Sequence, residues 1–138
     1  MIKRKKGFTL TEVLIVVVIM AVLASLILPR FFGQSERAIV SEAVGMLSAI
    51  RQGEASYQLE NNNYIATTAA GFSWDLLGID NPINAKFTYA VDAAGTATAT
   101  RLPAGDCVTI PFNGCTITLK SDGTWDQTLA TKHPYSPQ

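Results

Sequence analysis

Residues that build catalytic and metal sites are scarce in this chain. Its 138 residues include one histidine, His133, and two cysteines, Cys107 and Cys115. A soft-metal site needs more cysteine and histidine ligands than these, and nothing in the sequence places a nucleophile beside the histidine. Phosphate-binding glycine loops and zinc motifs are also absent from the sequence. We therefore expect a protein that is not an enzyme and that holds neither a metal nor a cofactor.

The chain also has no excess of charge of either sign. Lysine plus arginine and aspartate plus glutamate each number 11, and four of the basic residues stand together as Lys3-Arg4-Lys5-Lys6. Without residues 1–7 the chain keeps seven basic against eleven acidic residues, which is a side-chain charge of −4. Binding to nucleic acid needs a basic surface for the phosphates. We therefore expect no nucleic-acid partner for this chain.

A long apolar run follows the basic cluster. Residues Val13–Leu28 form a stretch of sixteen with one polar side chain, Ser25, and counting from Phe8 gives twenty-one. About 20 apolar residues span the hydrocarbon core of a bilayer as a helix. Because basic residues stay on the cytoplasmic side, we expect a cytoplasmic start, a membrane-spanning helix and an exported remainder.

Two simpler interpretations of the apolar run fit it less well. A signal peptide in front of a secreted enzyme needs a small-residue cut site, but large residues and Pro29 follow Ala24-Ser25, and no A-x-A pattern is present. A plain single-pass anchor leaves Glu12 unexplained, because a charge in hydrocarbon costs at least about 2.5 kcal/mol and usually marks a function or a partner. We therefore expect Glu12 to have a partner.

The residues around Glu12 carry the most specific motif. The stretch Gly7-Phe8-Thr9-Leu10-Thr11-Glu12, followed by the apolar run, resembles the type IV prepilin family, which includes type IV pilins and type II secretion pseudopilins. The resemblance covers roughly residues 1–60; Pro29 stands where the family commonly carries a proline, and Thr11 departs from its usual aliphatic residue. It implies that a prepilin peptidase cuts between Gly7 and Phe8 and that Phe8 becomes an N-methylated amino terminus.

Glu12 has two possible partners. Cleavage after Gly7 would create a positive α-amino group at Phe8, and residues four apart lie on one face of a helix. In a bundle of such helices, Glu12 would pair with the Phe8 amine of a neighbouring copy, which would favour assembly and fix the axial register. The alternative is a capping box within one chain, because Thr9-x-x-Glu12 fits that pattern.

The helix is expected to continue past the apolar run. Pro29 removes one backbone hydrogen bond and Gly33 is a second weak point, so residues 25–33 are a candidate hinge or melted segment, with a static bend as the alternative. Asparagines at positions 61–63 mark the expected end of the helix. The spacing in between predicts an amphipathic face, formed by Ile39, Ala43, Met46, Ile50, Gly53 and Tyr57 and widened by Val40, Val44 and Leu47.

Residues 61–138 predict a small β-rich domain with one short helix at Trp74–Leu77. Turn-forming residues separate short β-prone runs. The expected strands are Phe87–Val91, Thr96–Leu102, Cys107–Ile110 and Thr116–Lys120, with a shorter run at Thr124–Asp126. Alternation along these runs predicts an antiparallel sheet of about four strands with one covered face, and the amphipathic half of the helix supplies the cover. The predicted fold is α+β and pilin-like.

The two cysteines are expected to form a disulfide. Export would carry Cys107 and Cys115 to an oxidising space, where disulfides persist. Their pairing needs a wide loop centred on Pro111, so we expect no tight hairpin at Asn113-Gly114. Free buried thiols are the alternative.

These observations divide the chain into a basic leader at 1–7, a hydrophobic transmembrane and assembly helix at 8–29, an amphipathic continuation at 30–60 and a globular domain at 61–138. The resemblance implies a filament subunit, most of all a type IV pilin whose fibre serves adhesion, motility or DNA uptake. It would start in the inner membrane, with its amino terminus cytoplasmic and its domain periplasmic, and end in a cell-surface pilus. The implied partners are further copies of the chain, the prepilin peptidase and methyltransferase, and an inner-membrane assembly platform. A type II secretion pseudopilin and a membrane-tethered binding domain that does not polymerise are the alternatives.

Overall fold

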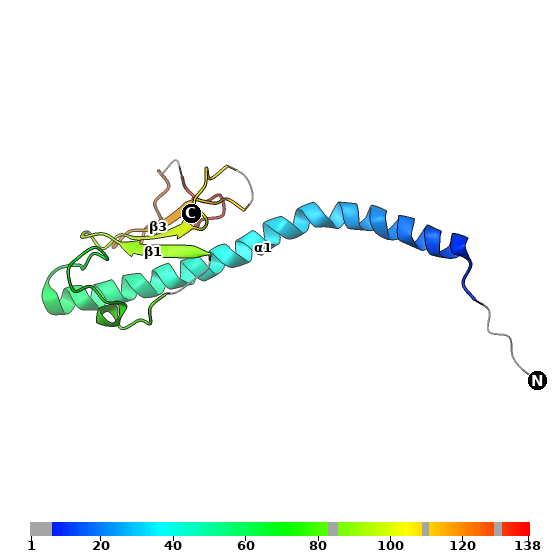
Figure 1. Ribbon diagram of the computed structural model, residues 1–138. Helices are drawn as coiled ribbons and strands as arrows, with labels where there is room; N and C mark the ends of the chain where they lie inside the picture. The colour runs from blue at the N-terminus through cyan, green and yellow to red at the C-terminus, as the bar shows by residue number, and fades with distance from the viewer. Residues whose placement is uncertain (1–6, 83–85, 109–110, 129–130) are drawn as a thin grey trace, which may run out of the picture. The chain divides into compact units, whose positions relative to one another are not determined.

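The computed structural model forms two compact units, Met1–Gln34 and Ser35–Gln138 (Figure 1). It describes residues 7–82, 86–108, 111–128 and 131–138, without the side chains of residues 28–32. The basic part of the predicted leader, residues 1–6, lies outside the described residues. One helix, α1 (Leu10–Asn61), contributes to both units.

In the first unit, α1 carries the apolar run. Every described side chain from Gly7 to Ile27 is exposed, and the window Leu10–Ile27 has a mean hydropathy of 2.8. It is the one candidate membrane span found within the described ranges. The predicted helix is confirmed, and its length and composition suit a membrane span.

The helix backbone continues through Pro29 and Gly33. A proline in a helix interior lacks one N–H donor, but the neighbouring hydrogen bonds can keep the backbone helical. We expected residues 25–33 to act as a hinge or to lose their helical structure on assembly. The structure is of a single chain, so this stays a prediction.

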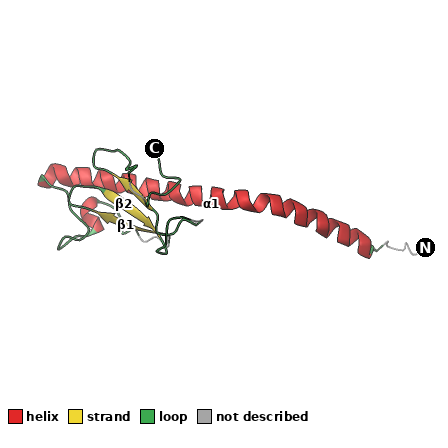
Figure 2. Ribbon diagram, turned by 90° about the horizontal axis from the view of Figure 1, so that it is seen from above, coloured by secondary structure: helices red, strands yellow, loops and turns green. Residues whose placement is uncertain are grey.

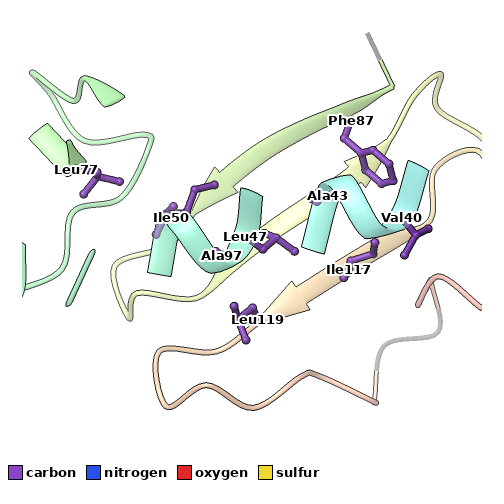
Figure 3. Close-up of a cluster of buried hydrophobic side chains, with 11 residues drawn as sticks. Val40, Ala43, Leu47, Ile50, Leu77, Phe87, Ala97, Ile117 and Leu119 are labelled. Atoms are coloured by element: carbon purple, nitrogen blue, oxygen red, sulfur yellow. The ribbon is translucent and has the colours of Figure 1, made fainter. Parts of the chain in front are cut away.

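In the second unit, α1 covers one face of the sheet with a row of side chains at helical spacing. Val40, Ala43, Leu47 and Ile50 are at most 3% exposed (Figure 3). The predicted face was correct at Ala43 and Ile50. Its centre is shifted, because Val40 and Leu47, expected to widen the face, are in its middle, and Ile39, Met46 and Tyr57 are only partly buried.

The sheet has three antiparallel strands in the order β1-β2-β3, and Figure 2 shows β1 and β2 side by side. They are β1 (Phe87–Val91), β2 (Ala97–Arg101) and β3 (Thr116–Leu119). Phe87 pairs with Arg101, and Ala97 pairs with Leu119. The α+β class is confirmed; among the described residues the sheet has three strands where about four were expected.

Two of the five runs expected as strands do not form strands among the described residues, and each has an identifiable reason. Cys107 and Val108 form a bend, and residues 109–110 lie outside the described residues. Cys107 has a φ of 59°, and its N–H donates to Asn113 O at 3.0 Å, so the chain turns back here instead of extending. The run Thr124–Asp126 is reduced to one isolated bridge between Trp125 and Leu119.

Alternation along the strands separates a core face from a threonine-rich face. The buried positions of β1 and β2 are Phe87, Val91, Ala97, Ala99 and Arg101, and the intervening positions of β2 are half-buried threonines. Ala97 and Ala99 are fully buried in the core cluster beneath α1. The core face therefore contains one charged residue, Arg101, which requires a buried partner.

A short 3-10 helix, η1 (Trp74–Leu77), is present where the sequence predicted one, and its last residue lies against α1 at Gly53. The Ser73 hydroxyl accepts the Asp75 N–H at its start, and Gly78 with a φ of 67° ends it. A Cβ added to Gly53 would meet the Leu77 carbonyl oxygen and lie 2.8 Å from the Leu77 Cβ. The glycine in α1 is therefore what allows η1 to pack this closely.

Candidate functional site

The motif around Glu12 forms a reciprocal cap at the start of α1. Because α1 begins at Leu10, Thr9 is its N-cap residue and Glu12 its third residue. The Glu12 N–H donates to Thr9 Oγ1 at 3.3 Å, and Glu12 Oε2 accepts the Thr9 N–H at 3.4 Å. The Thr9 hydroxyl also lies 3.5 Å from Glu12 Oε2. This geometry is a capping box, so the alternative partner considered for Glu12 is present in the structure.

The predicted cleavage position lies just outside this cap. Gly7, Phe8 and Thr9 are not helical, and a Cβ added at Gly7 would have nothing within 4 Å. A peptidase needs accessible, non-helical backbone, and the exposed Gly7–Phe8 bond meets that requirement. The Thr9 N–H belongs to the next peptide bond, so the capping hydrogen bonds would survive the cut.

The cap and the assembly role of Glu12 are compatible. The cap keeps the carboxylate at the positive end of the helix dipole, and Gly7, Phe8, Thr9 and Glu12 line one open crevice. A cut after Gly7 would place the new amine in the same crevice. Phe8 is 83% exposed and Leu10 is 81% exposed, so the surface around Glu12 is available to lipid or to another protein.

A second polar cluster is buried in the globular unit, and sequence reasoning missed it. Arg101 Nε lies 2.8 Å from Glu36 Oε1, and Arg101 Nη2 lies 3.3 Å from Glu36 Oε2. Arg101 Nη1 donates to Lys86 O at 3.1 Å and to Leu102 O at 3.0 Å. Glu36 is 3% and Arg101 is 7% exposed. The sequence feature that could have indicated this cluster is Arg101, because it occupies an inward position in β2.

His133 completes this cluster. Its side chain is fully buried, and its Nε2 lies 3.4 Å from Glu36 Oε1. The Tyr135 N–H donates to Nδ1 at 3.2 Å, which assigns the proton of the neutral ring to Nε2. Burial lowers the pKa of His133 below its ordinary value of 6.5; the hydrogen bond and charge of Glu36 oppose this, and Arg101 adds to it.

Glu54 is a second buried acid, and like Glu36 it is located on α1. Its Oε2 accepts the Ile65 N–H at 3.1 Å, while its Oε1 has no hydrogen-bond partner among the described residues. Burial raises the pKa of Glu54 above its ordinary value of 4.5; the Ile65 hydrogen bond opposes the shift and the charge of Asp92 adds to it. No group of three or more potential metal-ligating side chains occurs within the described parts of the chain.

The structure pairs Cys107 with Cys115, as the sequence predicted. Asn113 and Gly114 lie in a turn closed by the Cys115 N–H and Phe112 O at 3.2 Å. The described residues before this turn form no strand. The turn therefore does not join two strands in a tight hairpin, as we expected from the disulfide. Cys107 Sγ lies 3.2 Å from Thr131 O, so the disulfide loop contacts the C-terminal segment.

Comparison with known proteins adds independent information on the amino-terminal motif. The family described as the prokaryotic N-terminal methylation motif matches residues 2–28. The type II secretion system core protein G of Aeromonas hydrophila is 42% identical over 65 residues, which are 47% of this chain and 46% of that protein. The corresponding protein of Escherichia coli is 39% identical over 64 residues, or 46% and 44% of the two chains. This chain thus spans less than half the length of these relatives.

A longer match extends into the globular unit. The type IV wide pilus major component PilA4 of Thermus thermophilus is 33% identical over 95 residues. The match covers 68% of this chain and 70% of that protein. It is therefore longer than the apolar run, which by itself would give similarity between unrelated membrane helices.

Proposed function

The chain belongs to the family of type IV pilins and type II secretion pseudopilins, and from this we propose that it is a structural subunit of a helical filament, in the first place a type IV pilin. One observation carries the proposal: a carboxylate, Glu12, stands at the start of a helix whose apolar side chains are exposed on all sides up to Ile27. Such a helix needs lipid around it, or other copies of itself. No catalysis by the subunit is part of the proposal.

Processing is the first step of the proposed function. A prepilin peptidase cuts between Gly7 and Phe8, and the Phe8 amine is then methylated. The exposed, non-helical backbone at these two residues supports the proposal, because it leaves the bond accessible without unfolding α1. The precursor is anchored in the membrane by the apolar half of α1; we place it in the inner membrane, with the basic leader in the cytoplasm and the globular unit in the periplasm.

Assembly is the second step. The apolar helix leaves the lipid for the core of a filament, where Glu12 of one subunit pairs with the Phe8 amine of the next. Two charges that are each costly in an apolar medium then attract one another. The partners are further copies of the chain and an inner-membrane assembly platform, and the product is a cell-surface pilus.

A pilin is preferred to a pseudopilin because of how much of each relative the similarity covers. The match to the pilus component runs over 95 residues and 70% of that protein, whereas the match to the Aeromonas secretion protein covers 65 residues and 46% of that protein. A type II secretion pseudopilin remains the second candidate, since several relatives are described as core protein G. A tethered domain that does not polymerise would use Glu12 only as a helix cap.

The test uses Glu12→Gln, because glutamine keeps the capping box but removes the charge. We expect this variant to insert into the membrane and to be cleaved, and to form no filaments. Glu60→Gln, at an exposed position near the end of α1, is the matched control and should assemble normally. Filaments formed by Glu12→Gln would mean that Glu12 acts only as a cap.

Amino-terminal sequencing with intact mass distinguishes the candidates. A chain that starts at methylated Phe8 and is abundant in sheared surface fibres identifies a pilin. The same start found only in the membrane fraction supports the pseudopilin instead, and a start near Ala24 would contradict the family role.

A further inference from the structure

The C-terminal segment, residues 131–138, is attached to the edge of β3 by a single bridge. The Thr116 N–H donates to Thr131 O and the His133 N–H donates to Thr116 O, each at 2.8 Å. These bonds make a parallel bridge between Thr116 and Lys132. Two main-chain hydrogen bonds are a weak attachment on their own, so side-chain contacts decide whether the segment stays in place.

His133 is the fully buried side chain among those that make such contacts. Its ring centroid lies 5.4 Å from that of Phe112, in an edge-on arrangement, and 5.9 Å from that of Tyr135. The ring is fully enclosed, with one nitrogen on Glu36 and the other on the Tyr135 N–H. The segment thus inserts one ionisable side chain into a pocket closed to water.

Only a few charged groups face this pocket. Glu36 of α1 contacts His133 directly but already holds the Arg101 guanidinium of β2 with both carboxylate oxygens. Arg37, also of α1, lies 4.9 Å above the Tyr135 ring, and the Lys132 amine contacts the Gln127 side chain. The disulfide loop contributes the uncharged Phe112. The Glu36 carboxylate therefore contacts both the Arg101 guanidinium and the His133 ring, and its contact with Arg101 is the shorter one.

We propose that residues 131–138 form a proton-sensitive latch, which is closed while the His133 ring is neutral and opens when Nδ1 gains a proton. The added proton would turn Nδ1 from an acceptor into a donor, directed at the Tyr135 N–H. It would also place a second buried cation beside Arg101, with one carboxylate between them. Withdrawal of the segment into water relieves both conflicts, because each N–H then has water as an acceptor.

The direction of the pKa shift agrees with this geometry. The pKa of His133 is lowered in the folded chain, so the latched state binds fewer protons than the open state. The free energy that favours the closed latch is therefore at its maximum above the ordinary pKa of 6.5. It decreases as the pH falls through 6.5 toward the pKa of His133 in the folded chain. Opening would leave the main-chain groups of Thr116 unpaired at the edge of β3, where another strand can bind.

The experiment uses the full chain in detergent micelles. Since His133 is the only histidine, its C2–H resonance in an NMR titration is unambiguous. Hydrogen exchange is measured between pH 7.5 and pH 5 and expressed as protection factors, which removes the intrinsic pH dependence. Amides of His133 and Tyr135 report on the latch, and the amide of Ile117 in β3 reports on the core.

We expect His133 to titrate below 6.5. Protection of the latch amides should fall by up to about tenfold for each pH unit between 6.5 and that titration point, with protection at Ile117 unchanged. His133→Gln should remove this pH dependence. Ser136→Ala, a change within the same segment at a buried residue, should retain it.

Three results would overturn the latch. One is a His133 titration at or above 6.5, which can be read from the wild-type chain even if His133→Gln fails to fold. Another is a loss of protection at Ile117 in parallel with the latch amides, because that is global unfolding. The third is an unaltered pH dependence in His133→Gln.

Discussion

Glu36→Gln tests the buried ion pair that joins α1 to β2. The substitution keeps the shape of the side chain and one acceptor oxygen, but it leaves the Arg101 guanidinium, 7% exposed, without a counter-charge. Removing one partner of a buried pair costs about 3–5 kcal/mol, because the other charge remains buried. Domains of this size have a total stability of about 5–15 kcal/mol. We therefore expect the free energy of unfolding to fall by about 3–5 kcal/mol, a large part of the total.

The assay is urea unfolding of the full chain in detergent micelles, followed by the fluorescence of Trp74 and Trp125, which both lie in the globular unit. Glu60→Gln is the control and should change the free energy of unfolding by less than about 0.5 kcal/mol. The double variant Glu36→Gln with Arg101→Met removes the unpaired charge, so it should be more stable than the sum of the two single changes by about 0.5–3 kcal/mol. A cost for Glu36→Gln no larger than that of the control, or strict additivity in the double variant, would refute the reasoning.

Three further predictions concern packing, ionisation and the disulfide. Gly53→Ala should destabilise the globular unit by about 1–3 kcal/mol, because its Cβ overlaps Leu77; Gly45→Ala, where nothing lies within 4 Å, should stabilise it by about 0.5–1 kcal/mol in the same urea assay. The pKa of Glu54 is raised in the folded chain, so the folded state binds more protons and stability falls as the pH rises from 4.5 through the folded value. Glu54→Gln should flatten that part of a stability–pH curve, and an unchanged curve would remove Glu54 as its cause. Cys107→Ser should cost about 2–3 kcal/mol, and a wild-type chain equally stable with and without reductant would contradict this.

Local patterns predicted the elements of this chain well. The apolar run predicted the first half of α1, and the turn-forming asparagines predicted its end to within a residue of Asn61. Alternation and flanking turns predicted β1 at its observed bounds. These features depend on neighbouring residues, which is why the sequence alone is sufficient for them.

Contacts between distant residues were not predictable in the same way. Glu36 and Arg101 are 65 positions apart, and Glu36 and His133 are 97 apart, so no spacing rule connects them. Cys107–Ile110 has the alternation of a strand, but the disulfide and the positive φ of Cys107 turn the chain back. For Glu12, the sequence indicated both partners, and the structure shows the one within its own chain.

The capping box also bears on whether a filament can be dismantled. Glu12 is already hydrogen-bonded to Thr9 in a single chain, so under the proposed assembly the carboxylate exchanges one set of partners for another. The contribution of Glu12 to the free energy of each addition is then a difference between two satisfied states, and not the full strength of a charge pair. When a subunit leaves a fibre, the carboxylate can return to its own cap, so the loss at Glu12 is smaller than that of separating two charges with no other partner.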